Sequence, residues 1–369
     1  MAFQYRGIPP PIRRKKYLTG RLIRCIVTAA TKRSNQCYAK NRKVVTMDTV
    51  FLVGMIASGL FFGWTIGSHY TGAVMGTAFG AKLISTRKAT ILIAISVVLG
   101  ATLESHNVVK TVGTGVIDAS EMTVFRAMVM MLTAALVTAA NTYLRLPVST
   151  SQLAIFSVVG AGVAMKAHVF WSTTIVALAI TWVGTPILGT ILGFVITKLM
   201  DRVMGQSSER TKRVVGYLLI LVCCYAAYTL GCNNTGNAVG VFYGTGAIQS
   251  RMLAGFIGGI VMAIGALTWG RPLLEKVGLH IVSLDLNSAV GAQLAQGITA
   301  HIAASMGYPT SMNQAMIGGI AGAGLARGIK AIDLKAIKEI VISWFLTPVV
   351  GGIVSFALCS LLSWGLGVE

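Results

Sequence analysis

Two stretches of this sequence repeat at a constant spacing. Residues between positions 147 and 186 recur 162 positions later, as Pro147/Pro309, Gly160/Gly322, Gly162/Gly324, Trp182/Trp344, Thr185/Thr347 and Pro186/Pro348. A shorter match joins residues 65–72 to residues 229–236 at a spacing of 164. The chain is therefore expected to contain two copies of one folding unit.

The composition places this unit in a membrane. Hydrophobic residues make up 54% of the chain and charged residues 11%, against about 25% charged residues in an average soluble domain. Long apolar runs lie at 49–66, 89–103, 170–198, 214–230 and 337–365. About 20 apolar residues cross a bilayer as a helix, and continuous runs argue against the alternating pattern of a membrane barrel. We expect an all-α protein of the plasma membrane.

The N-terminal segment 1–46 differs from the rest. It carries twelve of the 31 lysines and arginines and no acidic residue. Such a segment could bind nucleic acid or anionic lipid, direct the chain to an organelle, or be an overlong start ahead of Met47. We favour the last interpretation and expect no nucleic-acid partner.

Charge also predicts how the two copies are oriented. We assign the first membrane repeat to 47–198, a linker to 199–213 and the second repeat to 214–369. The linker is basic and should be cytoplasmic, so the apolar run 170–198 ends inside. A basic segment precedes its partner run 337–365, which therefore starts inside. The repeats are expected to be inverted, which places the first repeat's start outside and favours the Met47 start.

Four polar segments interrupt the apolar spans, at 67–73, 147–152, 231–237 and 309–314. Pro147 and Pro309 precede Ser, Thr, Asn and Gln residues, a pattern typical of a helix start. The segments 147–164 and 309–326 are short for full spans. We expect re-entrant half-helix hairpins, because irregular backbone at membrane depth needs protein or a water-filled cavity around it. The four breaks should meet at one pocket.

Two of these segments resemble family signatures. Residues 231–238 read GCNNTGNA and resemble the G-A-N-D-V-A-N-A motif of the PiT-type inorganic phosphate transporters, and residues 147–152, PVSTSQ, resemble that family's P-V-S-T-T-H. The resemblance covers about 47–369 and includes sulfate permeases. It implies two inverted halves around a single oxyanion site, with coupling to a cation such as Na⁺ or H⁺. The sequence has no nucleophile–base pair, phosphate-cradling loop or metal cluster, so we expect no enzymatic activity and no organic cofactor. The expected partners are the inorganic oxyanion and the lipid bilayer, and a homodimer is an open alternative.

The candidate site residues follow from helix-start chemistry and from the resemblance. Helix N-termini and neutral Ser, Thr and Asn donors can bind an oxyanion, although the same side chains can simply cap helices. The substrate-binding candidates are Thr71, Ser149, Thr150, Ser151, Asn233, Asn234, Thr235, Thr310 and Ser311. The coupling-ion candidates are His69, Tyr70, Gln152, Asn237, Asn313 and Gln314. We expect no catalytic residue and no metal beyond Na⁺.

The sequence lacks the two carboxylates that the family signature contains. The family has an Asp in each half where this chain has Tyr70 and Asn234. Hydrogen phosphate can donate a hydrogen bond to a carboxylate, whereas sulfate cannot, and an unpaired acceptor costs about 1–3 kcal/mol. We therefore expect a symporter that slightly favours sulfate. A phosphate symporter and a passive anion channel are the alternatives.

Overall fold

The computed structural model describes residues 48–204, 208–278, 284–328 and 334–367, with no side-chain account for 334–341 and 343. The chain divides into two compact units, Met1–Val50 and Phe51–Glu369. The segment 1–46 and the expected Met47 start lie outside the described residues, and only residues 48–50 of the first unit are described. The fold below is that of the second unit.

The described residues form helices, short turns and one isolated bridge between Ile117 and Val169. The first half contains a helix that runs to residue 69, followed by α2 (Thr71–Gly80), α3 (Thr86–Glu104), α4 (His106–Lys110), α5 (Val124–Tyr143), α6 (Thr150–Ala164) and α7 (Val176–Met204). The second half contains α8 (Glu209–Gly244), α9 (Arg251–Trp269), α10 (Arg271–Lys276), α11 (Leu286–Ser305), α12 (Met312–Arg327) and α13 (Leu334–Leu366).

Seven helical segments in the described ranges are long and apolar enough to cross a membrane. α6 has 15 residues and α12 has 16, which at 1.5 Å per residue gives about 23 Å, short of a ~30 Å hydrocarbon layer. Both are half-helices in the predicted positions. The expectation of an all-helical membrane protein is confirmed.

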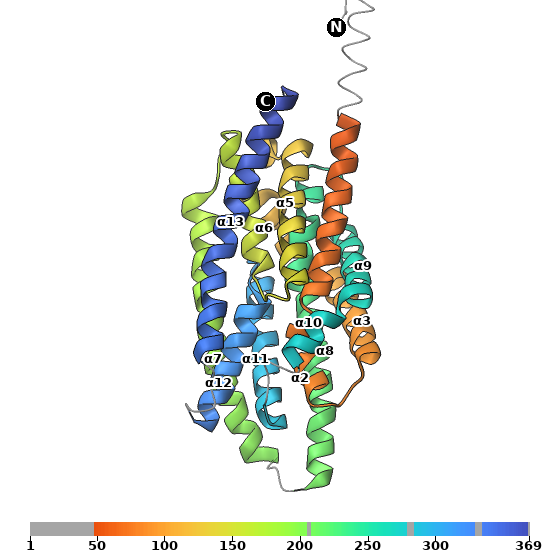
Figure 1. Cartoon of the computed structure of the whole chain (residues 1–369), viewed down its shortest axis with the longest axis vertical. Helices are drawn as coiled ribbons and strands as arrows, with labels where there is room; N and C mark the ends of the chain where they lie inside the picture. The colour runs from red at the N-terminus through yellow and green to blue at the C-terminus, as the bar shows by residue number, and fades with distance from the viewer. Residues whose placement is uncertain (1–47, 205–207, 279–283, 329–333, 368–369) are drawn as a thin grey trace, which may run out of the picture. The chain divides into compact units, whose positions relative to one another are not determined.

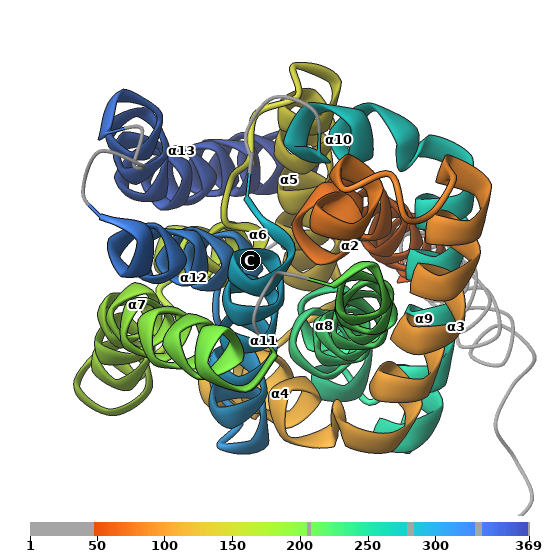
Figure 2. The same ribbon diagram turned by 90° about the horizontal axis from the view of Figure 1, so that it is seen from below.

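Each half-helix packs on the long helix of the other half. α6 lies against α13, and α12 lies against α7 and α11 (Figure 2). A Cβ at Gly160 in α6 would stand 2.2 Å from the Gly352 carbonyl oxygen, and a Cβ at Gly322 in α12 would stand 2.0 Å from that of Thr190. Since 160/322 and 190/352 are both repeat pairs, the contacts are reciprocal, as in a two-fold interface.

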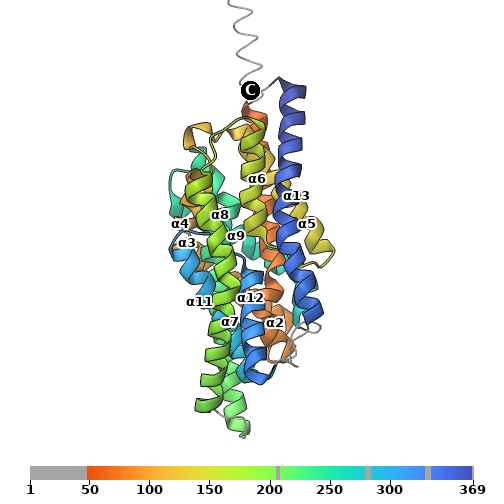
Figure 3. The same cartoon turned by 90° about the vertical axis from the view of Figure 1, so that its left-hand side faces the viewer.

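The figures show opposed directions for the repeated elements. α7 descends and α13 rises in Figure 1, as the colour gradient shows. α6 occupies the upper part of the bundle and α12 the lower part, one above the other, in both Figure 1 and Figure 3. The N-terminal ends of α6 and α12 therefore meet in the middle of the bundle.

One of the four predicted breaks is absent and another is reduced to one residue. Residues 231–237 lie inside the continuous helix α8, and 67–73 contain only a single turn residue, Tyr70, between two helices. The glycines of 231–237 serve packing: a Cβ at Gly231 would stand 2.2 Å from the Val97 carbonyl oxygen. Close approach to α3 explains that glycine, and the expectation of a break at 231–237 was wrong.

The reciprocal glycine contact yields a stability prediction. Gly322→Ala should destabilise the protein by about 1–3 kcal/mol or more, because the new methyl group would overlap backbone of α7 and force the helices apart. Gly184→Ala, in α7 with no atom within 4 Å of the new methyl group, is the matched control. Thermal unfolding of the two purified variants in detergent measures the difference; equal stability would contradict the packing described.

Candidate functional site

The two half-helices begin with the same capping geometry. Ser149 caps α6 by accepting a hydrogen bond from the Gln152 amide at 3.3 Å, and Ser311 caps α12 through the Gln314 amide at 3.3 Å. The four residues form two repeat pairs, 162 positions apart. A helix N-terminus has unpaired N–H groups and partial positive charge. Each half of the chain therefore contributes one such helix end.

Direct hydrogen bonds join these two ends. Asn313 Nδ2 donates to the Val148 carbonyl at 2.7 Å, and Ser151 Oγ donates to the Thr310 carbonyl at 2.8 Å. Each bond crosses from one half of the chain to the other. The segments 147–152 and 309–314 are therefore in contact, as expected.

The unbroken helix α8 contributes a row of three asparagines. Asn233 makes a paired contact with the Thr310 backbone, accepting from its N–H at 2.8 Å and donating to its carbonyl at 2.7 Å. Asn234 Oδ1 accepts from Asn237 Nδ2 at 3.0 Å and lies 2.9 Å from Ser151 Oγ, whose one proton goes to the Thr310 carbonyl. α8 thus fixes both half-helix starts through side chains, without a backbone break.

Tyr70 brings the first half's turn to the same cluster. Its hydroxyl oxygen accepts from the Thr150 N–H at 3.2 Å and from Thr150 Oγ1 at 3.0 Å. Tyr70, Thr150 and the cluster residues of α8 have no exposed surface. Neutral groups thus fill both positions where the family resemblance places a carboxylate.

His69 is hydrogen-bonded at both ring nitrogens. Thr142 donates its own hydroxyl proton to the Thr138 carbonyl at 2.8 Å, so the His69 Nδ1–H donates to Thr142 Oγ1 at 2.9 Å. The unprotonated Nε2 then accepts from the Val148 N–H at 3.2 Å. Nε2 also lies 3.3 Å from the Val148 carbonyl, and these contacts give His69 a role in holding the segment before α6.

Two predicted substrate residues point elsewhere. Thr71 Oγ1 donates to the Gly270 carbonyl at 2.5 Å, and Thr235 Oγ1 donates to Met262 Sδ at 3.3 Å. Both hydroxyls are used for contacts with the region of α9 and α10. The structure brings together the other predicted residues but not these two.

Several buried polar atoms of the cluster have no partner. They are Asn234 Nδ2, a donor, and Asn237 Oδ1, Gln152 Oε1 and Gln314 Oε1, which are acceptors. Buried polar groups are nearly always hydrogen-bonded, and each such gap costs about 1–3 kcal/mol. A free donor suits an anion and free acceptor oxygens suit a cation, so the cluster is chemically fitted to hold both.

Sequence reasoning missed two glutamines of α11. Gln296 Nε2 donates to the Met312 carbonyl at 3.2 Å, and Gln293 Nε2 donates to the Ala73 carbonyl at 3.1 Å and bonds Gln296 Oε1. They extend the buried polar cluster from the start of α12 to α2. The available signal was a pair of glutamines three residues apart on a helix of small residues, where polar side chains face the interior of the bundle.

The comparisons with known proteins address the identity of this chain. A family model described as the phosphate transporter family matches residues 66–355. The chain belongs to this family. It is accordingly an integral membrane transport protein and not an enzyme.

Members of this transporter family with similar sequences carry different substrate names. A protein named sulfate permease CysP, from Bacillus subtilis, is 30% identical over 83% of this chain and 86% of its own length. A candidate phosphate permease of Methanocaldococcus jannaschii is 27% identical over 85% of this chain and 99% of its own. A solved structure described as the sodium-dependent phosphate transporter matches with a TM-score of 0.79 and 21% identity, over 85% of this chain and 99% of that one, and supports the fold.

The bonded state of His69 generates a prediction for this transporter. His69→Gln should leave the pH profile of anion uptake between about pH 5 and 8 unchanged in shape, because an amide can donate to Thr142 and accept from Val148 as the neutral imidazole does. Uptake by reconstituted protein at stepped pH measures it. Loss of a titration step in the variant alone would make His69 a proton carrier.

Proposed function

We propose that this chain is a secondary active transporter that moves an inorganic tetrahedral oxyanion by symport with a cation. The observation that carries the proposal is the meeting of two half-helix N-termini, one from each half, in a fully buried cluster of neutral donors. An oxyanion is stabilised at such ends by N–H groups and partial positive charge. Without a full cation in the cluster, the ion can also leave.

The substrate-binding residues in this proposal come from three helices. They are Ser149, Thr150 and Ser151 at α6, Thr310 and Ser311 at α12, and Asn233 and Asn234 on α8. The unpaired Asn234 Nδ2 lies among them and has a proton to donate. Displacing the internal hydrogen bonds of Ser151 and Thr150 would free further donors for the anion.

The symmetry of the fold supports alternating access. Reciprocal glycine contacts and opposed half-helices fit inverted repeats. In this proposal the two repeats are 47–198 and 214–369, and the protein lies in the plasma membrane with the linker 199–213 on the cytoplasmic side. Thr150, Ser151 and Asn234 have no exposed surface. A site closed on both sides is expected of a carrier intermediate, and this favours a carrier over a passive channel.

Sulfate is the favoured substrate in this proposal, and phosphate is the alternative. Asn234 and Tyr70 provide no carboxylate that would repel a fully ionised anion. The relative named as a sulfate permease supports sulfate. The relative and the solved structure whose names include phosphate support the alternative.

Na⁺ is the favoured coupling ion. The unpaired acceptors near the cluster are amide oxygens, Gln152 Oε1, Gln314 Oε1 and Asn237 Oδ1, and an amide is not a base at physiological pH. Amide and backbone oxygens are ligands that suit hard cations. The glutamines occupy equivalent places in the repeats, so two related cation sites are expected, with Asn313 beside the second.

The direct test is labelled sulfate uptake into proteoliposomes, with unlabelled phosphate as competitor and with Na⁺ and pH gradients imposed separately. We expect saturable uptake that is driven by the Na⁺ gradient and abolished by a sodium ionophore. Competition by phosphate at far lower concentration than sulfate would reverse the substrate assignment. Conductance far above carrier turnover would replace the carrier with a channel.

The substrate argument predicts the effect of restoring a carboxylate. Asn234→Asp should shift the ratio of uptake towards phosphate by roughly tenfold or more, since an unpaired acceptor facing sulfate costs about 1–3 kcal/mol. Asn141→Asp, whose amide in α5 bonds only its own helix at Val137, is the control. An unchanged ratio in competition assays would count against the carboxylate argument.

The coupling argument predicts the effect of removing an acceptor. Gln152→Leu and Gln314→Leu keep the side-chain volume but remove the amide oxygen, so each should raise the Na⁺ concentration needed for half-maximal uptake. Gln→Glu at the same positions retains an oxygen and should preserve Na⁺ dependence. A sodium titration unchanged in both leucine variants would exclude these two positions as cation ligands.

A further inference from the structure

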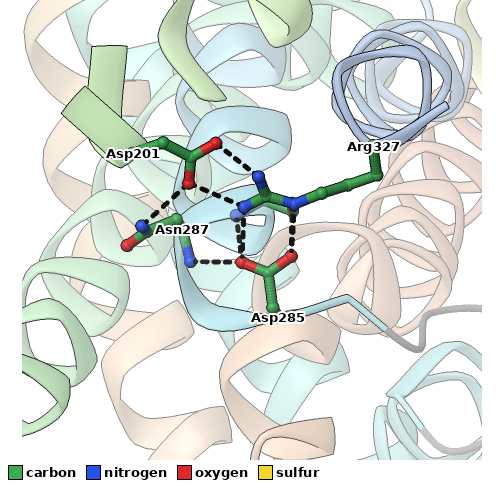
Figure 4. A network of polar contacts seen from close by, with 5 residues as sticks. Asp201, Asp285, Asn287 and Arg327 are labelled. Carbon is green, nitrogen blue, oxygen red and sulfur yellow. Dashed lines mark hydrogen bonds and ion pairs between the residues drawn. The ribbon is translucent and has the colours of Figure 1, made fainter. Parts of the chain in front are cut away.

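The C-terminal end of α12 carries an arginine that bridges two carboxylates (Figure 4). Arg327 bonds Asp201 through both Nη atoms, with Nη2 at 2.8 Å from Oδ1, and bonds Asp285 through Nε and Nη2, each at 2.9 Å. Arg327 Nε also lies 3.0 Å from Ser288 Oγ. Both carboxylates are thus held in two-point contacts by one guanidinium, a geometry that adds direction as well as energy.

These groups come from three helices and from both halves of the chain. Asp201 is near the end of α7, Arg327 ends α12, and Asp285 is the N-cap of α11, where it accepts from the Ser288 amide at 3.2 Å. Asn287 Nδ2 ties α11 to Asp201 at 3.0 Å. We call Arg327, Asp201, Asp285 and Asn287 the α12 clamp.

The clamp is a permanent tie and not a pH switch. The side chains of Arg327, Asp201 and Asp285 are each only about 30% exposed, and networks of this kind are stronger than isolated surface pairs. Burial alone would raise the pKa of Asp285, but hydrogen bonds from Arg327 and Ser288 lower it to about 2. The stabilisation is therefore complete above the ordinary carboxyl pKa of 3.8 and is lost only as pH falls towards 2.

A rigid element links the clamp to the anion cluster. α12 is an uninterrupted helix of 16 residues, about 24 Å at 1.5 Å per residue, and Ser311 caps its other end. Backbone contacts hold it along its length: a Cβ at Gly318 would stand 2.5 Å from the Pro186 carbonyl oxygen, and one at Gly319 would stand 2.3 Å from that of Ala292. Because the helix is uninterrupted, a movement of α12 along its axis would carry Arg327 and Ser311 together.

The C-terminal end of α6, which is equivalent to that of α12, has different contacts. There, Arg126 in the first turn of α5 donates to the Met165 carbonyl at the end of α6, at 3.2 Å, and to the Glu121 carbonyl. These bonds cap a helix end but do not bring two carboxylates to one guanidinium. Among the side chains that the structure describes, only the end of α12 carries such an ionic clamp, although both half-helices have a serine N-cap.

We propose that Arg327 is a positioning residue that fixes α12 lengthwise between α7 and α11, and so sets the depth at which Thr310 and Ser311 present their donors. The inference rests on the proposed anion transport for its functional consequence. Its mechanical part, the restraint of the first turn of α12 from the far end of the helix, stands independently of which ion is carried.

The test compares Arg327→Gln with a matched control. Arg271→Gln removes the same charge from an exposed pair with Glu275 inside α10, where no helices are joined. We expect Arg327→Gln to weaken anion binding about tenfold, an ordinary size for coupling between distant sites, and to speed amide hydrogen exchange in residues 312–316. The control should change neither quantity.

Two further variants keep the test decisive. Asp285→Asn removes one arm of the clamp but retains an N-cap residue for α11, and it serves if Arg327→Gln fails to fold. It should weaken binding in the same direction, and adding Asp201→Asn to Arg327→Gln should cause little further loss, since both act through one network.

Three outcomes are distinguished, with sulfate and phosphate as calorimetric probes on purified protein. Weaker binding with faster exchange at 312–316 supports the clamp. Lower thermal stability with unchanged affinity and unchanged exchange there would overturn it, because that result describes a merely structural ion pair. If wild-type protein binds neither anion while the exchange effect holds, the restraint of α12 stands and the proposed function fails.

Discussion

The structure depends on two helices that begin inside the bundle instead of at its surface. Each start leaves backbone N–H groups that hydrocarbon cannot satisfy. Here Ser149 and Ser311 cap the first turns, Tyr70 accepts from the Thr150 N–H, and Asn233 of α8 accepts from the Thr310 N–H. A polar cluster at this depth exists because the half-helices need it, and it is the same cluster that can receive an anion. The requirement of the backbone and the chemistry of binding are met by one set of side chains.

The packing of each half-helix against the long helix of the other half holds this cluster in place. α6 lies on α13 and α12 on α7, so neither half surrounds its own half-helix. Glycines at repeat-related positions allow backbone-to-backbone contact, and small residues are what permit close packing in a medium without a hydrophobic driving force between helices. The duplication therefore produces one interlocked bundle and not two adjoining ones.

Much of this could be predicted from residues, and the failures have physical reasons. Pro147 and Pro309 with their following hydroxyl residues fixed both half-helix starts within a few positions, since caps are local. Gly231 and Gly236 led to the wrong prediction of a break at 231–237, because a glycine that allows close helix packing cannot be told in the sequence from one that allows a turn. Thr71 and Thr235 were placed in the site from helix-start chemistry and the family resemblance, whereas their hydroxyls bond Gly270 and Met262 in the structure. Gln293 and Gln296 lay outside the repeat pattern, so only packing revealed them.

The exchange of helices also has a consequence for biosynthesis. Between Ala164, which ends α6, and Leu334, which begins α13, the ribosome must add 170 residues. At about 5–20 residues per second, α6 would wait on the order of ten seconds or more for its partner. The asparagines of α8, at positions 233–237, are made well before α13, so only α13 is missing for the whole of that interval. Membrane insertion of this chain should therefore rely on the translocon or a chaperone to shelter α6 until α13 is made.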